Sequence, residues 1–345
     1  MPSVRLQGIH NGRDDAPYHP SPTLLAAANT ALLLSTPLLL AGEPGCGKTD
    51  FAWYAARALA TALGDPEAKT AKPLECYVRS DLRARDLLYQ YDALARFADA
   101  QHPRPSDPQR AQDARHYIAL QSLGIGLMSP VQRVVLIDEI DKAPRDLPND
   151  LLREMDQGSF TITEIPEVAA GTIHDSFGSG IELKRRMQRP ADAPRPLVVV
   201  TSNAERQLPD AFLRRCVFFH IPFPEEAELQ KILRERFPSH GGQSGPSGSA
   251  RANAVITDAL TISKALRDPA NRLTKPPGTA EIIGFVRALL EPGRESDWQS
   301  CRPLSDLAQL VRSDARVPWR KLPALHCLIK LKEDLDTLDR LSPQP

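Results

Sequence analysis

Uninterrupted apolar runs along this chain predict the strands of a buried parallel sheet. Three runs of mainly aliphatic residues, at 37–41, 134–137 and 197–200, lack the alternation of polar and apolar positions that marks a half-exposed strand. Strands covered by helices on both faces show this pattern. Val217–Ile221 is a further strand-like run. The expected fold class is therefore α/β.

The segment from Leu24 to Gly42 has no charged residue over 19 positions, a length that would also fit a membrane span. Asn29 and Pro37 are among the residues that interrupt it, so we predict a helix, a turn and then the first buried strand. Apolar residues recur with helical spacing in four later segments. These predicted helices are Phe51–Leu63, Glu225–Phe237, Ala254–Leu266 and Thr279–Leu290.

A glycine-rich loop joins the first predicted strand to the helix that follows it. Glycines let a backbone curl so that its N–H groups face a phosphate chain, and the start of a helix adds a favourable dipole. Lys48 would reach the β- and γ-phosphates of a nucleotide, and Thr49 would offer its hydroxyl to Mg²⁺. The predicted nucleotide-binding residues are Gly42, Glu43, Pro44, Gly45, Cys46, Gly47, Lys48, Thr49 and Asp50.

Two acidic residues, Asp138 and Glu139, directly follow the second strand. Parallel sheets bind their ligands at the carboxyl ends of the strands. Asp138 would hold Mg²⁺ through water, and Glu139 would position and polarise the water that attacks the γ-phosphate. Such a pair alone often marks only the end of a strand. With the glycine-rich loop about 90 residues upstream, it predicts hydrolysis of ATP.

Polar residues also follow the third strand. Asn203 would hydrogen-bond the attacking water and the γ-phosphate, or it would simply cap the next turn. Arg214 and Arg215 end a short predicted helix, where positive charge commonly offsets the helix dipole. From these residues alone, both interpretations stay open for each site.

Several motifs, in this order along the chain, resemble AAA+ ATPases of the MoxR branch. The most specific stretch is Lys142–Ile162, because members of that branch follow the same acidic motif with a helix, an M-x-x-G turn and a short β-hairpin. Arg79–Ala100 resembles the insert that this branch carries within its second helix. The resemblance covers residues 23 to about 290. The motifs are G-E-P-G-C-G-K-T, L-I-D-E-I-D-K-A-P, N-D-L-L-R-E-M-D-Q-G-S-F and T-S-N.

The resemblance implies a P-loop parallel sheet flanked by helices and followed by a small α-helical lid. Asn203 would be the sensor 1 residue, and Arg215, with Arg214 beside it, would act on the γ-phosphate of a neighbouring subunit. Lys275 is preferred over Arg287 as the nucleotide-binding residue of the lid. The expected parts are an N-terminal extension (1–22), a core with an insert (23–222), a lid (223–290) and a helical tail (291–345).

The resemblance also implies partners. AAA+ proteins typically form hexameric rings, and MoxR-type members are often paired with proteins that bear a von Willebrand factor A domain. We therefore expect a homo-oligomer that uses Mg²⁺-ATP to remodel or activate a client protein, with or without an adaptor.

The composition of the chain says little about its partners, but its cysteine content indicates a reducing compartment. The chain has 43 basic and 43 acidic residues among 345, so its overall charge does not favour nucleic acid or a membrane surface. Five cysteines are an odd number, and none forms a C-x-x-C pair. This usage is typical of a reducing compartment, and a cytoplasmic location is expected.

Four segments outside these motifs carry further expectations. Gln101–Asp113 is polar and Pro-rich and is expected to be an exposed loop that contacts a client or adaptor. Lys184–Arg189 is the one concentrated basic run, either a solvated loop or a grip on polypeptide or nucleic acid. Pro238–Ala250 has the composition of a flexible linker, and the leucines of Leu322–Leu341 are expected to pack on the lid.

Two other classes of function remain open at this stage. One is a nucleic-acid motor of a restriction or defence system, for which the basic run would carry the binding. The other is a nucleotide-gated scaffold with little turnover. A GTPase is less favoured, because the chain contains no N-K-x-D sequence for guanine.

Overall fold

The computed structural model describes most of the chain, and its contacts divide the chain into two compact units. The described residues are 4–167, 171–175, 179–237, 246–290, 302–313 and 316–342. The first unit consists of residues 1–42 and 48–221, and the second of residues 43–47 and 222–345.

A parallel sheet of five strands, in the order β11-β3-β10-β7-β4, forms the centre of the first unit. All residues of β3 and β10 are buried, as their uninterrupted apolar runs predict. Four of the strands coincide with the predicted ones, and β4 adds an edge strand that the apolar pattern did not reveal. The strands are β3 (Leu38–Gly42), β4 (Leu74–Tyr77), β7 (Val134–Asp138), β10 (Leu197–Ser202) and β11 (Val217–Ile221).

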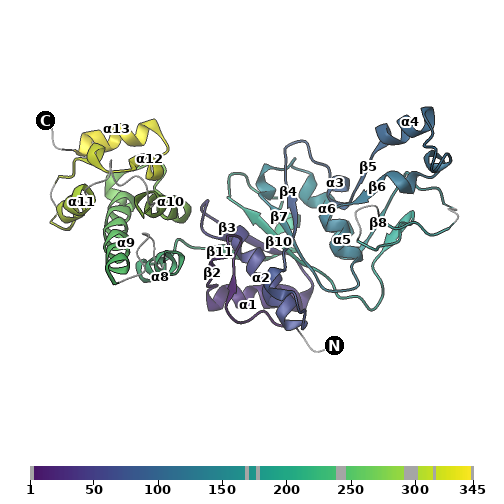
Figure 1. The fold of residues 1–345 in the computed structure, drawn as a ribbon, viewed down its shortest axis with the longest axis horizontal. Helices are drawn as coiled ribbons and strands as arrows, with labels where there is room; N and C mark the ends of the chain where they lie inside the picture. The colour runs from purple at the N-terminus through teal and green to yellow at the C-terminus, as the bar shows by residue number, and fades with distance from the viewer. Residues whose placement is uncertain are drawn as a thin grey trace. The chain divides into compact units, whose positions relative to one another are not determined.

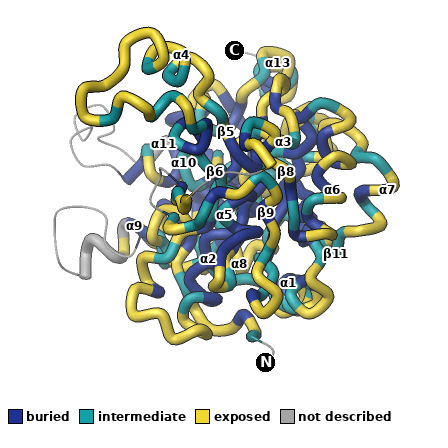
Figure 2. Tube along the Cα trace, turned by 90° about the vertical axis from the view of Figure 1, so that its right-hand side faces the viewer, coloured by how far each residue is buried: buried dark blue, intermediate teal, exposed yellow. Residues whose placement is uncertain are grey.

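Helices pack around this sheet (Figure 1). Helix α2 is buried along most of its length (Figure 2). Helix α1 begins after Ser21, whose side chain accepts a hydrogen bond from the Leu24 N–H, and ends at Ser35, which has a left-handed backbone conformation. The helices are α1 (Pro22–Leu34), α2 (Lys48–Ala62), α3 (Ala84–Leu88), α5 (Ser122–Met128), α6 (Leu147–Gln157) and α7 (Asp210–Leu213).

The uncharged segment Leu24–Gly42 forms helix α1, a turn and strand β3, which confirms the prediction of two separate elements. Among the described residues, no helix combines the length and the apolar character that crossing a bilayer requires.

An insert lies between α3 and α5. Strands β5 (Tyr89–Tyr91) and β6 (Ile118–Leu120) pair in antiparallel fashion and carry helix α4 (Ala93–Gln101). Most residues of the predicted loop Gln101–Asp113 are exposed, as expected, although Arg110–Gln112 forms a short 3-10 turn.

A second hairpin follows α6, which ends at Gly158 in a left-handed conformation. Strand β8 (Ser159–Thr161) pairs with β9 (Arg186–Gln188) in antiparallel fashion. The two strands form the hairpin that was expected after this turn, and residues 162–185 separate them. The interpretation of 184–189 as a loop is wrong in part, because Arg186–Gln188 forms β9 and buries Met187 between two outward-facing neighbours.

The N-terminal extension packs on helix α2. Strands β1 (His10–Asn11) and β2 (Pro17–Tyr18) form a small antiparallel pair. The buried guanidinium of Arg57 donates hydrogen bonds to the Gly12 carbonyl (2.7 Å) and to the Asp15 carboxylate (2.8 Å). These contacts hold the extension beside the helix that follows the glycine-rich loop.

The second unit is helical and has one apolar core. Residues from the lid and from the tail share this core, including Phe285, Trp319 and Leu338, so the periodic leucines of the tail do pack on the lid. The helices are α8 (Glu226–Arg236), α9 (Pro246–Arg267), α10 (Thr279–Leu290), α11 (Arg302–Arg312), α12 (Leu325–Leu328) and α13 (Lys332–Leu341).

The predicted linker Pro238–Ala250 is wrong at its C-terminal end. Residues 246–250 are the first turn of α9. Proline is tolerated there, because the first N–H groups of a helix have no intrahelical partner to lose. Residues 238–245 of this prediction lie outside the described part of the chain.

Candidate nucleotide site

The glycine-rich loop connects β3 to α2 with the backbone curl that its sequence predicts. Gly45 (φ 78°) and Gly47 (φ 92°) adopt left-handed conformations that side chains with a Cβ disfavour. Lys48, the first residue of α2, is buried, and its Nζ donates a hydrogen bond to the Gly42 carbonyl at 2.9 Å. The lysine therefore folds back over the loop, where a phosphate chain would meet it.

Thr49 and Asp138 meet at the carboxyl edge of the sheet. The Thr49 hydroxyl donates to the Asp138 carboxylate, at 3.1 Å from one oxygen and 3.3 Å from the other. Hydroxyl and carboxylate oxygens are the hard ligands that Mg²⁺ prefers, and Mg²⁺ keeps several waters and takes few protein ligands. Although 89 residues separate them in sequence, the two predicted metal residues lie together and fit this ion.

Thr201, near the end of β10, connects the two acidic residues. Its buried hydroxyl donates to Asp138 Oδ1 at 2.6 Å and accepts from the backbone N–H of Glu139 at 2.8 Å. Glu139 has a left-handed backbone (φ 60°, ψ 51°), which is strained for a residue other than glycine. The threonine thus fixes the orientation of one carboxylate and the backbone that presents the other.

The Glu139 side chain has two partners. Its Oε2 accepts a hydrogen bond from Lys142 Nζ at 2.6 Å, and its Oε1 accepts one from Asn203 Nδ2 at 3.3 Å. The hydrogen bond to Glu139 raises the pKa of the Lys142 ammonium. The contact with Asn203 brings the predicted water-positioning residue and the predicted sensor together.

Asp141 holds the loop that carries Asn203. Its buried carboxylate accepts hydrogen bonds from the backbone N–H groups of Asn203 (3.2 Å) and Glu205 (3.1 Å). The loops after β7 and β10 are therefore tied together at this residue. Sequence reasoning did not single out Thr201, Asp141 or Lys142, although all three stand inside motifs that it quoted.

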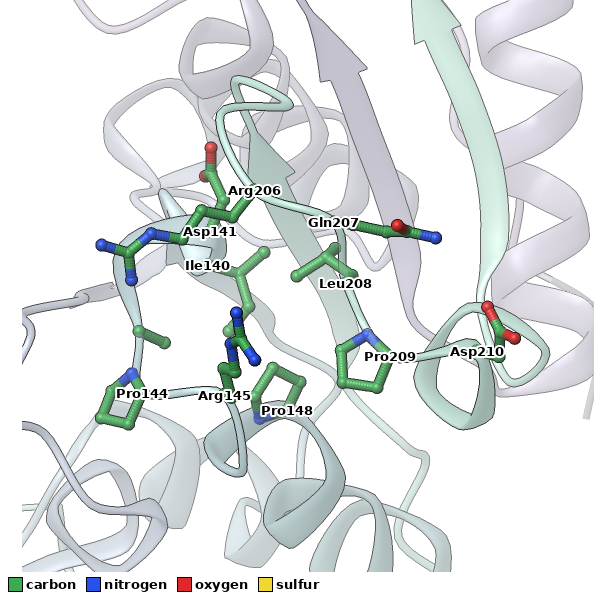
Figure 3. A pocket seen from close by; sticks show the side chains of 11 residues that line it. Ile140, Asp141, Pro144, Arg145, Pro148, Arg206, Gln207, Leu208, Pro209 and Asp210 are labelled. Carbon is green, nitrogen blue, oxygen red and sulfur yellow. The ribbon is translucent and has the colours of Figure 1, made fainter.

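The same two loops border an open pocket of about 580 Å³, with Asp141 on its wall (Figure 3). Most of the lining is apolar, and the exposed residues Arg145 and Arg206 add positive charge.

The two predicted trans-acting arginines lie at the end of α7. Arg214 caps the helix, and Arg215 forms a long ion pair with Asp156 of α6, at 3.6 Å between Nε and Oδ2. The Arg215 side chain is 53 % exposed. At this distance and exposure, the ion pair with Asp156 holds Arg215 only weakly.

Two further predicted nucleotide-binding residues have other contacts. One oxygen of the Asp50 carboxylate accepts a hydrogen bond from the Arg13 N–H at 3.0 Å, so Asp50 is engaged by the N-terminal extension. Lys275 lies in the second unit, where its N–H donates to the buried carboxylate of Asp334 at 3.0 Å and its side chain is exposed. The nucleotide roles of Asp50 and Lys275 stay predictions.

Two of the described cysteines have strongly raised thiol pKa values. Burial raises the pKa of both Cys76 and Cys216 to about 12, so neither is a thiolate at neutral pH. None of the four described cysteines takes part in a disulfide.

Fold and site together define a P-loop nucleoside triphosphatase of the AAA+ class, with a parallel five-stranded sheet, a glycine-rich loop and acidic residues on the strand two places away. Residues 37–237 match the family model described as the AAA domain of the dynein-related subfamily. This match covers more than half of the chain, which therefore belongs to that family. At the level of the family, membership implies nucleotide binding and hydrolysis.

Two solved structures are similar to the chain at low sequence identity. The AAA domain of FIGL-1 in complex with ADP is 15% identical, with a TM-score of 0.33, over 90% of this chain and 73% of that one. A lysine-to-arginine mutant of RuvB from Thermotoga maritima is 12% identical, with a TM-score of 0.40, over 84% of this chain and 66% of that one. No curated protein matches the chain.

Proposed function

We propose that the chain is a MoxR-type AAA+ ATPase that binds Mg²⁺-ATP, assembles as a ring and uses hydrolysis to remodel or activate a client protein. A protein with a von Willebrand factor A domain is the proposed adaptor. The insert that carries α4 and the hairpin β8–β9 after α6 support the assignment to this branch, because both stand where the branch motifs predict them.

The observation that carries the ATPase proposal is the convergence of four side chains. Thr49, Asp138, Glu139 and Asn203 come from three neighbouring strand ends and are joined by hydrogen bonds between Thr49 and Asp138 and between Glu139 and Asn203. A scaffold that only stored nucleotide would not require the predicted base Glu139 and the predicted sensor Asn203 to lie beside the predicted metal residues. Convergence of this kind is what hydrolysis requires.

Each residue then has a role in the reaction. Lys48 would bind the β- and γ-phosphates, and Thr49 with Asp138 would hold Mg²⁺. The bound ion supplies charge neutralisation at the phosphates. Glu139 would accept the proton of the attacking water, while Asn203 would hold that water in line with the γ-phosphate.

The exposed Arg215 supports the ring. An arginine that acts on a neighbouring subunit stabilises the charge of the transition state and accelerates related hydrolases by about 10³- to 10⁵-fold. Arg215 is half exposed and weakly paired, as a residue that reaches across an interface must be.

Two substitutions test the ATPase proposal. Glu139→Gln should retain ATP binding and lower turnover by about 10²- to 10⁴-fold, the usual contribution of a general base. Lys48→Ala should lose ATP binding itself. Binding is measured with a fluorescent ATP analogue, and turnover by phosphate release. Normal turnover by Glu139→Gln would show that Glu139 is not the base.

A second candidate, the nucleotide-gated scaffold with little turnover, is favoured by one contact. Lys142 occupies an oxygen of Glu139 at 2.6 Å and thereby competes with the attacking water for the base. In such a scaffold, ATP would be bound and hydrolysed too slowly to drive repeated remodelling.

The remaining alternative, a nucleic-acid motor, gains no specific support. Within 184–189, Lys184 pairs with Glu182, Arg185 donates to the Ile165 carbonyl, and Arg189 donates to the Ala193 carbonyl. Three of the four basic side chains of this run therefore make contacts within the protein.

A further inference from the structure

Helix α4 exposes apolar side chains to solvent and directs polar side chains toward the protein, the reverse of an ordinary surface helix. None of its nine residues is buried. Leu94 and Phe97, three positions apart and therefore neighbours on the helix surface, are 83% and 65% exposed. Single exposed apolar residues are common, but an adjacent pair on a helix with no buried side is not explained by packing.

The opposite side of α4 faces its own insert with polar groups. Arg96 donates hydrogen bonds to the Ala111 carbonyl (2.9 Å) and to the Tyr91 hydroxyl (3.1 Å). Asp99 accepts hydrogen bonds from Arg104 (2.8 Å) and Tyr117 (2.8 Å). Polar contacts thus anchor the helix, and the apolar side is left outward.

The position of α4 agrees with a docking role. Figure 1 draws it beyond the β5–β6 pair, on the side away from the five-stranded sheet. Polar contacts within the insert hold it there, so Leu94 and Phe97 are presented on a fixed support. The surface formed by Leu94 and Phe97 is called the α4 face below.

We propose that the α4 face binds short apolar segments of client polypeptides. The two side chains offer on the order of 300 Å² of apolar surface, whereas a stable interface needs about 800 Å² from each partner. Contact through this face alone is therefore weak and transient. Such contact fits a client that is engaged and released, and not a permanent second copy of the chain.

The distribution of charge on α4 also favours a client polypeptide as the partner. The charged side chains of α4 are used inside the insert, so the outward face has no charges with which to fix the register of one defined partner. A neutral apolar face accepts many sequences, as binding to unfolded or extended clients requires.

The inference takes its meaning from the proposed remodelling function, but its test does not depend on ATP turnover. The probe is fluorescein-labelled α-lactalbumin that has been reduced and carboxymethylated, which exposes apolar segments permanently. Its binding to the full chain is followed by fluorescence anisotropy, with an unfolded Gly/Ser-rich polypeptide as the polar comparison.

The double substitution Leu94→Gln with Phe97→Gln should weaken probe binding at least tenfold, because glutamine keeps helix propensity and removes the apolar surface. The matched control is Leu33→Gln with Leu34→Gln on α1, a pair that is 74% and 59% exposed. This control should bind the probe as the wild type does. Circular dichroism should show unchanged helix content in both variants.

Other outcomes contradict the proposal. It is overturned if the α4 variant binds as tightly as wild type, if both double variants lose binding equally, or if the wild type binds no probe. It is also overturned if the α4 substitutions abolish self-association, because a second copy would then cover the face. Loss of ATP turnover in the wild type would sink the proposed ATPase function and leave this binding result standing.

Discussion

Thr201 shows how one hydroxyl can organise the candidate nucleotide site. It is the one residue of the described site that contacts both acidic residues, through the Asp138 carboxylate and the Glu139 N–H. Neither contact touches the nucleotide, so its proposed role is positioning. Groups that orient a metal ligand typically change metal affinity or activity 10- to 100-fold when removed.

We expect Thr201→Val to raise the Mg²⁺ concentration for half-maximal turnover by about 10- to 100-fold. Valine keeps the shape of threonine but neither donates to Asp138 nor accepts from Glu139. Thr201→Ser retains the hydroxyl and should stay close to wild type. Nucleotide affinity without Mg²⁺ should be unchanged in both variants, and a Mg²⁺ titration that is the same for Val and wild type would refute the role.

Lys142, which contacts the Glu139 carboxylate, provides a second prediction at the scale of single residues. The Lys142–Glu139 pair is about half exposed, so it contributes only about 0–1 kcal/mol. If the pair restrains the base, Lys142→Met should increase turnover by at most about fivefold, since 1.4 kcal/mol corresponds to a factor of ten.

The pH dependence of this effect follows from the raised pKa of Lys142. A raised pKa means that the pair is formed at lower pH and is lost as pH rises through that value. The difference between Lys142→Met and wild type should therefore be constant between about pH 6 and 10 and disappear only above the ordinary lysine pKa of about 10.4. A fall in turnover in the variant would show that the lysine supports the base.

At the scale of elements, helix α5 must pack closely to join the insert to the sheet. A Cβ added at Gly124 would lie 2.0 Å from the Leu88 carbonyl oxygen, and one at Gly126 would lie 2.4 Å from a methyl of Val135. Glycine at these two positions lets α5 approach the end of α3 on one side and β7 on the other.

We expect Gly124→Ala to lower the free energy of unfolding by about 1–3 kcal/mol, the usual cost of overpacking. Its backbone neighbour cannot rotate away as a side chain would. The matched substitution is Gly284→Ala in α10, where a Cβ meets no atom within 4 Å. That change should stabilise its unit by about 0.5–1 kcal/mol, because alanine favours the helix. Denaturant unfolding monitored by circular dichroism measures both, and equal effects would contradict the packing argument.

At the scale of the whole molecule, the proposed ring makes Arg215 a residue of the neighbouring active site. Glu139→Gln subunits lack the base but retain Arg215, while Arg215→Ala subunits retain the base but lack the arginine. Each variant alone should be inactive. In an equal mixture, an intact base would face an intact arginine at some interfaces.

The mixture should recover roughly a quarter of wild-type turnover per subunit, since half of the sites have the base and half of their neighbours supply the arginine in a closed ring. Phosphate release measures it, and the two variants assayed separately serve as the controls that should stay inactive. A mixture that stays inactive, in subunits shown by light scattering to assemble together, would exclude action in trans.

The strands and the phosphate loop could be predicted because their signals are local. Val134–Asp138 and Leu197–Ser202 are apolar without interruption, and the loop from Gly42 to Thr49 is defined by residue types at fixed spacing. Strand β4 gave no such signal, because it lies at the edge of the sheet and its residues are only partly buried. The start of α9 at Pro246 was missed because composition alone indicated a linker.

By itself, the sequence predicted which residues would bear the chemistry: the glycine-rich loop, Asp138 with Glu139, and Asn203. Only the tertiary structure decided which of them meet and what holds them. The Thr201 hydroxyl lies 62 residues from Glu139 in sequence, and the Asp141 contact with Asn203 spans a similar distance. Hydrogen bonds of this range depend on the order and register of strands β7 and β10, which no local pattern specifies. The outward apolar side of α4 was likewise settled by the contacts of the insert, because amphipathic spacing does not say which side faces the protein.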